Sequence, residues 1–468
     1  MSAADIHTEA QFIDHGYIDR LLAENQCASP EEIRAILEKS RALKGLSHEE
    51  VAKLIHVEDP TLLQEIFAVA GAIKQKIYGN RVVMFAPLYI SNYCVNNCTY
   101  CGYQHHNSFE RRKLNKAEIE REVKLLEKMG HKRIALEVGE DPVNTPIEFV
   151  LDAIDTIYNT ENENGTIRRI NVNIAATTVE NYRKLKEANI GTYILFQETY
   201  HKPTYEAVHP KSVKGNYTYH LNAFDRAMTG GIDDVGGGVL FGLYDYKFEV
   251  LGLMLHNEHL EQTFGVGFHT ISVPRLKKAE GMTLDQFSHL ISDADFKKIV
   301  AVIRLAVPFT GIILSTRETQ AIREEVINYG VSQVSAGSQT GVGGYSDNEA
   351  HKSVAQFEGG DHRSTMEVVR SLLKDGFIPS YCTACYRSGR TGDRFMQLAK
   401  SGQIGNVCQP NALMTLMEFI LDYGDEELIA LGKKTIYETV ETIAREDVRA
   451  LTLSNLKKIE AGTRDLFL

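Results

Sequence analysis

The chain has 468 residues, of which 43% are hydrophobic and 24% charged, and its formal net charge is −11. This length and composition predict a soluble globular protein with a large core, built as one barrel-sized domain with extra segments or as two to three domains. The acidic balance argues against nucleic acid as a partner, because binding phosphate requires clustered Lys and Arg. No apolar run reaches the roughly 18–20 residues that cross a bilayer, and the N-terminus lacks the apolar core of a secretory signal. We therefore expect a cytoplasmic protein without membrane contact, in which cysteines are reduced.

The first 80 residues are predicted to be helical. Ser29 before Pro30, and Ser47 before a run of acidic residues, have the pattern of helix starts with Ser as the N-cap. We expect these helices to form an N-terminal extension over residues 1–80. The isolated Cys27 in this region is interpreted as a packing or surface thiol.

From about residue 82, short β-branched runs alternate with amphipathic segments such as 116–129 and 178–188. The expected strands are 82–90, 133–138, 170–174, 192–196, 234–240, 267–273, 311–315 and 333–335. Eight strand–helix units predict an α/β protein whose core is a (β/α)8 TIM barrel over residues 81–380, with an open doubly wound sheet as the alternative. In such a barrel, the chemistry lies at the C-terminal ends of the strands.

After residue 380 the character of the chain changes again. A loop rich in Gly, Arg and Cys is expected over residues 381–409, followed by a helical tail over residues 412–468. We expect residues 381–468 to form a third, mainly helical unit that docks on the barrel.

The first group of cysteines follows the first expected strand. Cys94, Cys98 and Cys101 have the spacing C-x3-C-x2-C. Three thiolates can hold three irons of a 4Fe–4S cluster and leave the fourth iron open to a small chelating molecule such as S-adenosylmethionine (SAM). The alternative is a zinc site, with His105 or His106 as the fourth ligand.

This spacing, with an aromatic residue before the last cysteine and a position after the first strand of a barrel, resembles the radical SAM superfamily. The resemblance covers roughly residues 82–350 and implies three SAM-binding residues. Tyr100 holds the aromatic position whose backbone lies against adenine, and Glu198, after the fourth strand, would bind the ribose hydroxyls. Glu140 ends a Gly–Glu element that would bind the methionine amine, because a carboxylate pairs with an ammonium. An ordinary acid near a helix start is the alternative for Glu140.

Within the superfamily, the chain is similar to the aromatic amino acid lyases. The stretches that carry this similarity are 196–200, 271–276, 314–318 and 335–345. Two groups of tyrosine lyases share them: 2-iminoacetate synthase, which serves thiamine thiazole synthesis, and the FeFe-hydrogenase maturases of the HydG family.

The mouth of the expected barrel carries candidate substrate residues. Arg317 follows the seventh strand, where a guanidinium can grip a substrate carboxylate in a two-point contact. The alternative for Arg317 is a salt bridge to Glu318 or Glu324. Ser338 follows the eighth strand and is expected to help hold the amino acid. Arg275 is a further candidate, although its stretch is also interpretable as a structural turn.

The second group of cysteines separates the two tyrosine lyases. Cys382, Cys385 and Cys408 have the spacing C-x2-C-x22-C, which again gives three thiolates and favours a second cluster with one open iron. The HydG family carries this arrangement in its C-terminal domain, whereas 2-iminoacetate synthase is not expected to. The following stretch, 386–394, also resembles the HydG family. A structural zinc knuckle is the alternative.

The resemblance to the HydG family implies a two-stage reaction. A 5′-deoxyadenosyl radical from SAM abstracts hydrogen from L-tyrosine, whose Cα–Cβ bond breaks to give p-cresol and dehydroglycine. Dehydroglycine then becomes carbon monoxide and cyanide on an extra iron at the second 4Fe–4S cluster, for assembly of the hydrogenase H-cluster. In the family, free L-cysteine bridges that iron and a histidine touches it. We expect the histidine to be His269, on the sixth strand among apolar neighbours, although a buried, merely hydrogen-bonded His is the alternative.

The expected partners are L-tyrosine, an electron donor and other hydrogenase maturation proteins. Two other functions stay open: a one-cluster tyrosine lyase for thiamine, and a non-catalytic scaffold whose cysteines bind zinc or pass iron on. The second group of cysteines argues against the first. Glu140 and Arg317 argue against the second, because a metal carrier needs no pocket for an ammonium and a carboxylate.

Overall fold

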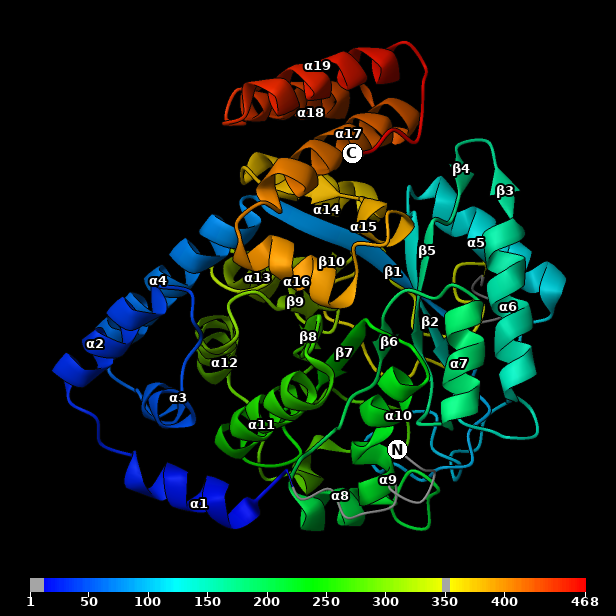
Figure 1. Cartoon of the computed structure of the whole chain (residues 1–468). Helices are drawn as coiled ribbons and strands as arrows, with labels where there is room; N and C mark the ends of the chain where they lie inside the picture. Colours follow the sequence, from blue (N-terminus) through cyan, green and yellow to red (C-terminus); the bar gives the residue numbers. More distant parts are fainter. Residues whose placement is uncertain (1–11, 347–353) are drawn as a thin grey trace.

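The computed structural model describes residues 12–346 and 354–468, and its centre is a closed barrel of eight parallel strands (Figure 1). Neighbouring strands pair in chain order, and the last strand pairs back to the first, with Val83 opposite Gln333. The strands of the barrel are β1 (Arg81–Ser91), β2 (Arg133–Val138), β5 (Arg169–Asn173), β6 (Tyr193–Ile194), β7 (Val235–Gly238), β8 (Thr270–Ser272), β9 (Gly311–Leu314) and β10 (Gln333–Ser335). The expected (β/α)8 barrel is confirmed, and the pairing of β10 with β1 excludes the open sheet.

All eight expected strands occur, but four are shorter than the apolar pattern predicts: β6, β7, β8 and, by one residue, β9. β6 ends at Ile194, because the chain then keeps only single hydrogen bonds to β7 and bends into a loop in which Glu198 has φ +67°. β8 begins only at Thr270, so His269 lies just before the strand and not on it.

Helices surround the barrel. Amphipathic segments form α5 (Lys116–Lys128) and α7 (Val179–Glu187), close to their expected bounds. The other helices between the strands are α6 (Ile147–Asn159), α8 (Lys202–Val208), α9 (Tyr217–Leu221), α10 (Ala223–Thr229), α11 (Tyr246–Phe264), α12 (Asp293–Ala306) and α13 (Gln320–Val326). A two-stranded hairpin of β3 (Glu161–Asn162) and β4 (Gly165–Thr166) interrupts the pattern after α6.

The N-terminal segment is helical, as expected. It consists of α1 (His15–Glu24), α2 (Pro30–Ser40), α3 (His48–Ile55) and α4 (Pro60–Tyr78), which lie along the side of the barrel formed by α11 and α12 (Figure 1). Ser29 and Ser47 each form a capping box with the Glu three residues later. Cys27 is exposed in the connection between α1 and α2. Residues 1–11, part of the segment assessed for a secretory signal, lie outside the described residues.

The segment after the barrel is more helical than expected. β11 (Ile378–Ser380) follows α14 (Thr365–Lys374) and pairs with the first residues of β1, outside the barrel. The expected loop over 381–409 is wrong, because it contains α15 (Ala384–Arg387), α16 (Gly392–Lys400) and the start of α17 (Gly405–Tyr423). Gly392, with φ +54°, begins α16, and Gly402, with φ +73°, follows its C-cap residue Ser401, where the composition suggested a continuous loop.

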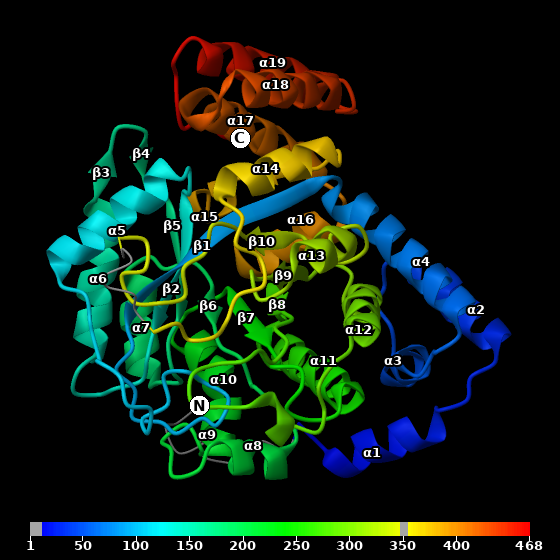
Figure 2. The same cartoon turned by 180° about the vertical axis from the view of Figure 1, so that it is seen from behind.

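α17 is followed by α18 (Glu426–Val440) and α19 (Glu446–Glu460), and the three helices cover one end of the molecule (Figure 2). The loop after β1 lies at the opposite end. The division into units 1–80, 81–380 and 381–468 stays a prediction.

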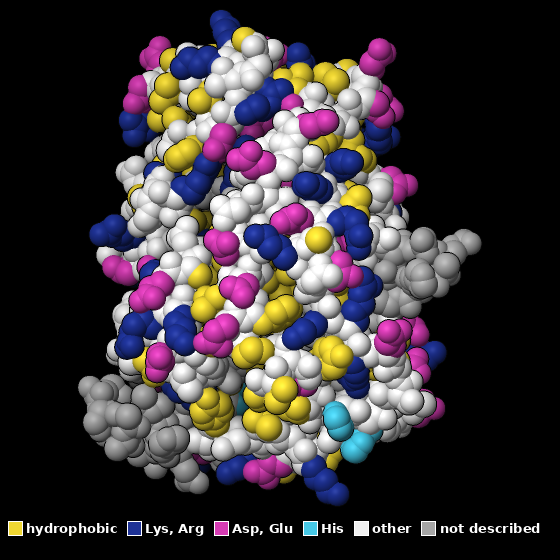
Figure 3. Space-filling view, turned by 90° about the vertical axis from the view of Figure 1, so that its right-hand side faces the viewer, with side chains coloured by type: hydrophobic (Ala, Val, Ile, Leu, Met, Phe, Trp, Pro, Cys, Tyr) yellow, Lys and Arg dark blue, Asp and Glu magenta, His cyan; other side chains and the backbone are white. Residues whose placement is uncertain are grey.

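The surface offers little to nucleic acid on the face shown in Figure 3, where basic and acidic side chains are interspersed without an extended area of one sign. Among the described helices, none combines the length and the apolar character that a membrane span needs.

Candidate active site

The loop after β1 brings Cys94, Cys98 and Cys101 to one cavity at the C-terminal ends of the strands. A neighbouring loop holds this segment in place: the Thr99 N–H donates to the Val208 carbonyl over 3.0 Å. Burial raises the pKa of Cys98, and the charges of the other two cysteines act in the same direction. Burial also raises the pKa of Cys101, to about 11. A cationic group that binds at this point would therefore favour the thiolates.

Arg111 fixes the cysteine loop from outside. Its guanidinium donates to the carbonyls of Asn92 and Tyr103, both at 2.7 Å, and of Gln104 at 2.6 Å. The basic run that begins at Arg111 lies in a loop and not on the face of a helix.

The donor set fits a cluster held by three cysteines, since three thiols from one short loop face one cavity. Across the described residues, no three His, Cys, Asp or Glu side chains converge on a point that could hold a single metal ion. His105 and His106 are exposed, and the His105 ring contacts the Cys94 carbonyl at 3.3 Å.

Glu140 reaches the same cavity from the end of β2. Its carboxylate accepts a hydrogen bond of 2.5 Å from the Asn96 amide, and its carbonyl accepts one of 2.8 Å from the Val95 N–H. Burial raises its pKa against the effect of that amide. The preceding Gly139 permits this contact, because a Cβ there would lie 2.3 Å from the Tyr93 carbonyl oxygen.

Glu198 lies across the cavity and is paired with Lys214 at 2.6 Å. Burial alone would lower the pKa of Lys214, but the charges of Glu198 and Cys98 more than offset it and raise the pKa. Tyr100 also lines the cavity, and its hydroxyl lies 2.7 Å from Nε2 of His209. This side of the cavity thus holds a buried ion pair.

Arg317 lies at the inner end of this cavity. Its guanidinium carbon is 3.3 Å from the centre of the Phe357 ring, and burial lowers its pKa. The expected alternative of a salt bridge is wrong: Glu318 pairs with Arg275, and Glu324 pairs with Arg363. Among the described residues, no carboxylate lies within ion-pair distance of Arg317.

Glu137 faces the Arg317 guanidinium from β2. Burial raises its pKa to about 8, although the charge of Arg317 and a hydrogen bond from Asn173 both act to lower it. At neutral pH, Glu137 is therefore largely protonated and leaves the guanidinium without a counter-charge.

A second cavity continues from Arg317 into the interior of the barrel, and the two share several lining residues. Ser338 lines this inner cavity, and its buried hydroxyl has no hydrogen-bond partner among the described residues. Arg275 is instead fully engaged, since it pairs with Glu318 and, over 2.8 Å, with Asp293.

The second group of cysteines lies at the other end of the barrel, near the N-terminal ends of the strands. The interaction with the Cys408 thiol lowers the pKa of Cys385 against the effect of burial, and Arg390 acts in the same direction. The Cys382 carbonyl accepts a hydrogen bond of 2.9 Å from the guanidinium of Arg133, the first residue of β2. Burial raises the pKa of Cys382.

His269 lies at this same end, among polar groups and beside the Phe395 ring, whose centre is 4.6 Å from that of the imidazole. Its Nε2 is 3.2 Å from the hydroxyl of Tyr386, the residue after Cys385, and its Nδ1 is 3.7 Å from Asp234. Burial lowers its pKa. The Tyr386 ring also stacks on the guanidinium of Arg169, which pairs with Asp234 at 3.2 Å.

Comparison with known proteins assigns the chain to a family. Residues 88–253 match the Radical SAM superfamily, and residues 272–378 match the Biotin and Thiamin Synthesis associated domain. A solved structure of HydG, a maturase of the [FeFe]-hydrogenase, is 58% identical, with a TM-score of 0.96 over 98% of this chain and 100% of that one. The chain belongs to the HydG family.

HydG from Carboxydothermus hydrogenoformans is 39% identical, with a TM-score of 0.83 over 96% of this chain and 100% of that chain. The 2-iminoacetate synthases of Salmonella typhimurium and Escherichia coli are 28% and 29% identical over 346 residues, which is 74% of this chain and 89% of each relative. The chain is therefore a radical SAM maturase of the HydG and 2-iminoacetate synthase type. Membership of the radical SAM superfamily implies a 4Fe–4S cluster and SAM. The similarity to HydG suggests a role in hydrogenase maturation with a small-molecule substrate.

Sequence reasoning missed several residues of this HydG-family site. Glu137 was visible in the Gly–Glu element but was given no role. Lys214 belongs to no motif, and Asn96 is one of the unspecified positions between Cys94 and Cys98, so the roles of both emerge only from partners in other loops. Asp234 and Tyr386 likewise acquire significance only through His269.

Proposed function

We propose that this chain cleaves the Cα–Cβ bond of L-tyrosine to p-cresol and dehydroglycine, and converts dehydroglycine into carbon monoxide and cyanide for H-cluster assembly. The observation that carries the proposal is Arg317. A buried guanidinium without a carboxylate partner is costly, and it lies at the inner end of the cavity that the first three cysteines line. A substrate carboxylate would supply the missing charge.

Cys94, Cys98 and Cys101 would hold the cluster that binds SAM. When bound, the cluster and SAM would supply a 5′-deoxyadenosyl radical after reduction of the cluster by one electron. Glu140 would bind the methionine ammonium, since its carboxylate is held by Asn96 toward the same cavity.

The remaining contacts of SAM fall to residues across the cavity. Glu198, oriented by Lys214, would bind the ribose hydroxyls, and the backbone at Tyr100 would lie against adenine.

The substrate would lie between the two cavities. Arg317 would bind the tyrosine carboxylate in a two-point contact, and Ser338 offers a free hydroxyl to the amino group. Neutral Glu137 would leave Arg317 available for the substrate at physiological pH. The inner cavity would enclose the amino acid and exclude water from the reacting carbons.

The second site would complete the conversion. Dehydroglycine contains the atoms of one carbon monoxide, one hydrogen cyanide and one water, so no oxidant is needed. Cys382, Cys385 and Cys408 would hold the second 4Fe–4S cluster, and His269 would bind the extra iron that free L-cysteine bridges. Asp234, whose carboxylate lies 3.7 Å from Nδ1 without a hydrogen bond to it, would favour this orientation of the His269 ring through its charge.

The test is an anaerobic assay of the protein reconstituted with iron and sulfide, supplied with SAM, tyrosine and dithionite. We expect both p-cresol and carbon monoxide. P-cresol without carbon monoxide would indicate the activity of 2-iminoacetate synthase, an enzyme to which the chain is similar over 346 residues. Neither product, with SAM still cleaved, would refute tyrosine as the substrate.

A further inference from the structure

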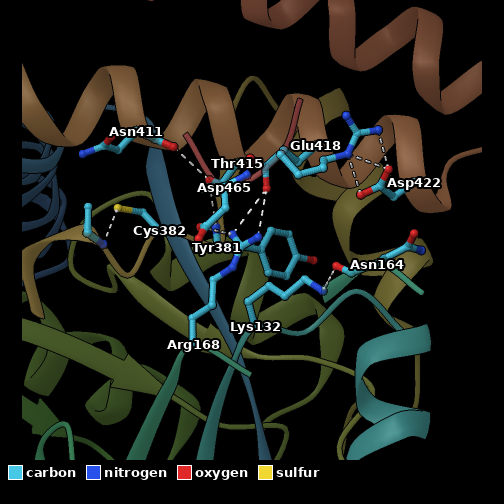
Figure 4. A network of polar contacts seen from close by, with 12 residues as sticks. Lys132, Asn164, Arg168, Tyr381, Cys382, Asn411, Thr415, Glu418, Asp422 and Asp465 are labelled. Atoms are coloured by element: carbon cyan, nitrogen blue, oxygen red, sulfur yellow. Dashed lines mark hydrogen bonds and ion pairs between the residues drawn. The ribbon is translucent and has the colours of Figure 1, made fainter. Parts of the chain in front are cut away.

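The segment that follows α19, residues 461–468, folds back between α17 and α15, and we call it the tail segment. Asp465 is its central contact. The Asp465 carboxylate pairs with Arg168 at 3.2 Å and with Arg387 at 2.7 Å. Its N–H donates to the Glu418 carboxylate over 2.6 Å. In Figure 4, Arg168, Glu418 and Asp465 point toward one another beneath α17. One residue thus joins the barrel, α17 and the helix that carries Cys385.

The backbone of Asp465 is strained, because its φ of +62° lies in the left-handed region. A residue other than glycine stays in that region only where surrounding contacts hold it there. The hydrogen bond to Glu418 and the two ion pairs are such contacts.

The rest of the tail segment makes contacts on both sides of the second cysteine group. The Phe467 ring lies 4.0 Å below the Arg387 guanidinium. The Leu468 N–H donates to Asn411 over 2.8 Å, and the Leu468 carbonyl accepts from Arg390 over 2.5 Å. Arg390 in turn interacts with the Cys385 thiol.

The helix with Cys385 needs such support. α15 has four residues, and Thr383 at its N-cap makes no side-chain hydrogen bond to it. A single turn of helix is not stable by itself, since the first turn fixes several residues for one hydrogen bond. Its position is therefore determined by contacts from outside, and Arg387, the last residue of α15, is held by the tail segment.

We propose that the tail segment is a clasp that positions Cys385 relative to Cys382 and Cys408, with Asp465 as its main positioning residue. This inference rests on the proposed second cluster. Without the clasp, α15 loses the contacts of Arg387, and the three thiols no longer hold the geometry that a cluster requires.

The test compares Asp465→Asn with the wild-type chain, both reconstituted anaerobically. Iron and sulfide content and the EPR signals of the reduced protein are measured with and without SAM. We expect the variant to lose the signal that does not respond to SAM, with iron and sulfide reduced to about half, because one of two clusters is missing. The SAM-responsive signal and p-cresol formation stay, whereas carbon monoxide is lost.

Two further variants serve as controls. Asp465→Glu keeps the charge and should retain part of the second signal, which a mere loss of packing would not explain. Asp447→Asn removes a similar ion pair with Arg445 that is exposed and distant in sequence from the cysteines, and it should match the wild type.

The clasp is refuted if Asp465→Asn keeps both signals and full carbon monoxide release. If Asp465→Asn loses the SAM-responsive signal as well, Phe467→Ala, which removes only the ring below Arg387, is judged by the same criteria. A wild-type chain with a single, SAM-responsive cluster would instead contradict the proposed second site itself.

Discussion

Replacing Arg317 with Gln should raise the KM for tyrosine strongly and leave SAM cleavage intact. Hydrogen bonds to charged groups contribute about 1.5–3 kcal/mol, and losing one partner of a buried charged pair costs on the order of 2–5 kcal/mol. Arg317 is buried, but Gln retains an amide that can donate one hydrogen bond to the carboxylate. A net loss of about 2–4 kcal/mol corresponds to a KM roughly 30- to 700-fold higher, at 1.4 kcal/mol per factor of ten.

The variant should still fold. The charge of Arg317 lowers the pKa of Glu137, so its removal raises that pKa further above about 8. Glu137 then stays protonated at neutral pH, so removal of Arg317 leaves no unpaired Glu137 carboxylate in the cavity. This compensation is why we choose Gln over an acidic or bulky apolar replacement.

The assay is anaerobic p-cresol formation as a function of tyrosine concentration, with SAM cleavage in the absence of tyrosine as the check on the first site. Lys278→Gln is the matched control, because Lys278 also lies in the loops beyond the strands but pairs with Glu358 on the exposed surface. An unchanged KM in Arg317→Gln would remove Arg317 from the substrate site and with it the main support for an amino acid substrate.

Three further predictions concern separate parts of the machinery. Cys98→Ala should abolish p-cresol formation, whereas Cys385→Ala should keep it and stop carbon monoxide release; identical behaviour of the two folded variants would contradict the two-site scheme. Above pH about 8, ionised Glu137 places a negative charge beside the substrate carboxylate, so KM for tyrosine should rise there in the wild type and less in Glu137→Gln, as pH profiles of kcat/KM would measure. Gly139→Ala should lose the first cluster, because its Cβ would collide with the Tyr93 carbonyl at 2.3 Å and displace the cysteine loop; wild-type iron content and an unchanged SAM-responsive EPR signal would contradict this.

The barrel could be predicted because its strands are short β-branched runs separated by helical segments, and this local pattern decides both the type and the order of the elements. The spacing of Cys94, Cys98 and Cys101 was equally local. The ends of strands were less predictable: His269 has the apolar neighbours of a strand residue in sequence, but packing places it before β8.

Residues whose roles come from distant partners could not be found in the sequence. Lys214 matters through its ion pair with Glu198 in another loop. Tyr386 meets His269 although 117 positions separate them. The prediction of a loop over 381–409 was wrong for a different reason, because glycine composition does not distinguish a helix boundary from a continuous loop.

The barrel rule places chemistry at the C-terminal ends of the strands, and the first site follows it, but the second group of cysteines lies at the opposite end. The inner cavity extends from Arg317 to Asn171 in β5. The Asn171 amide oxygen accepts a hydrogen bond of 3.0 Å from Arg169. The Arg169 guanidinium in turn stacks on the ring of Tyr386, the residue after Cys385. Under the proposed function, Asn171, Arg169 and Tyr386 would form part of the wall between the end of the cavity and the second site. Arg169 differs from Arg317 in that its charge is balanced by Asp234 at 3.2 Å, so a carboxylate that leaves Arg317 would meet no second unpaired cation at this wall.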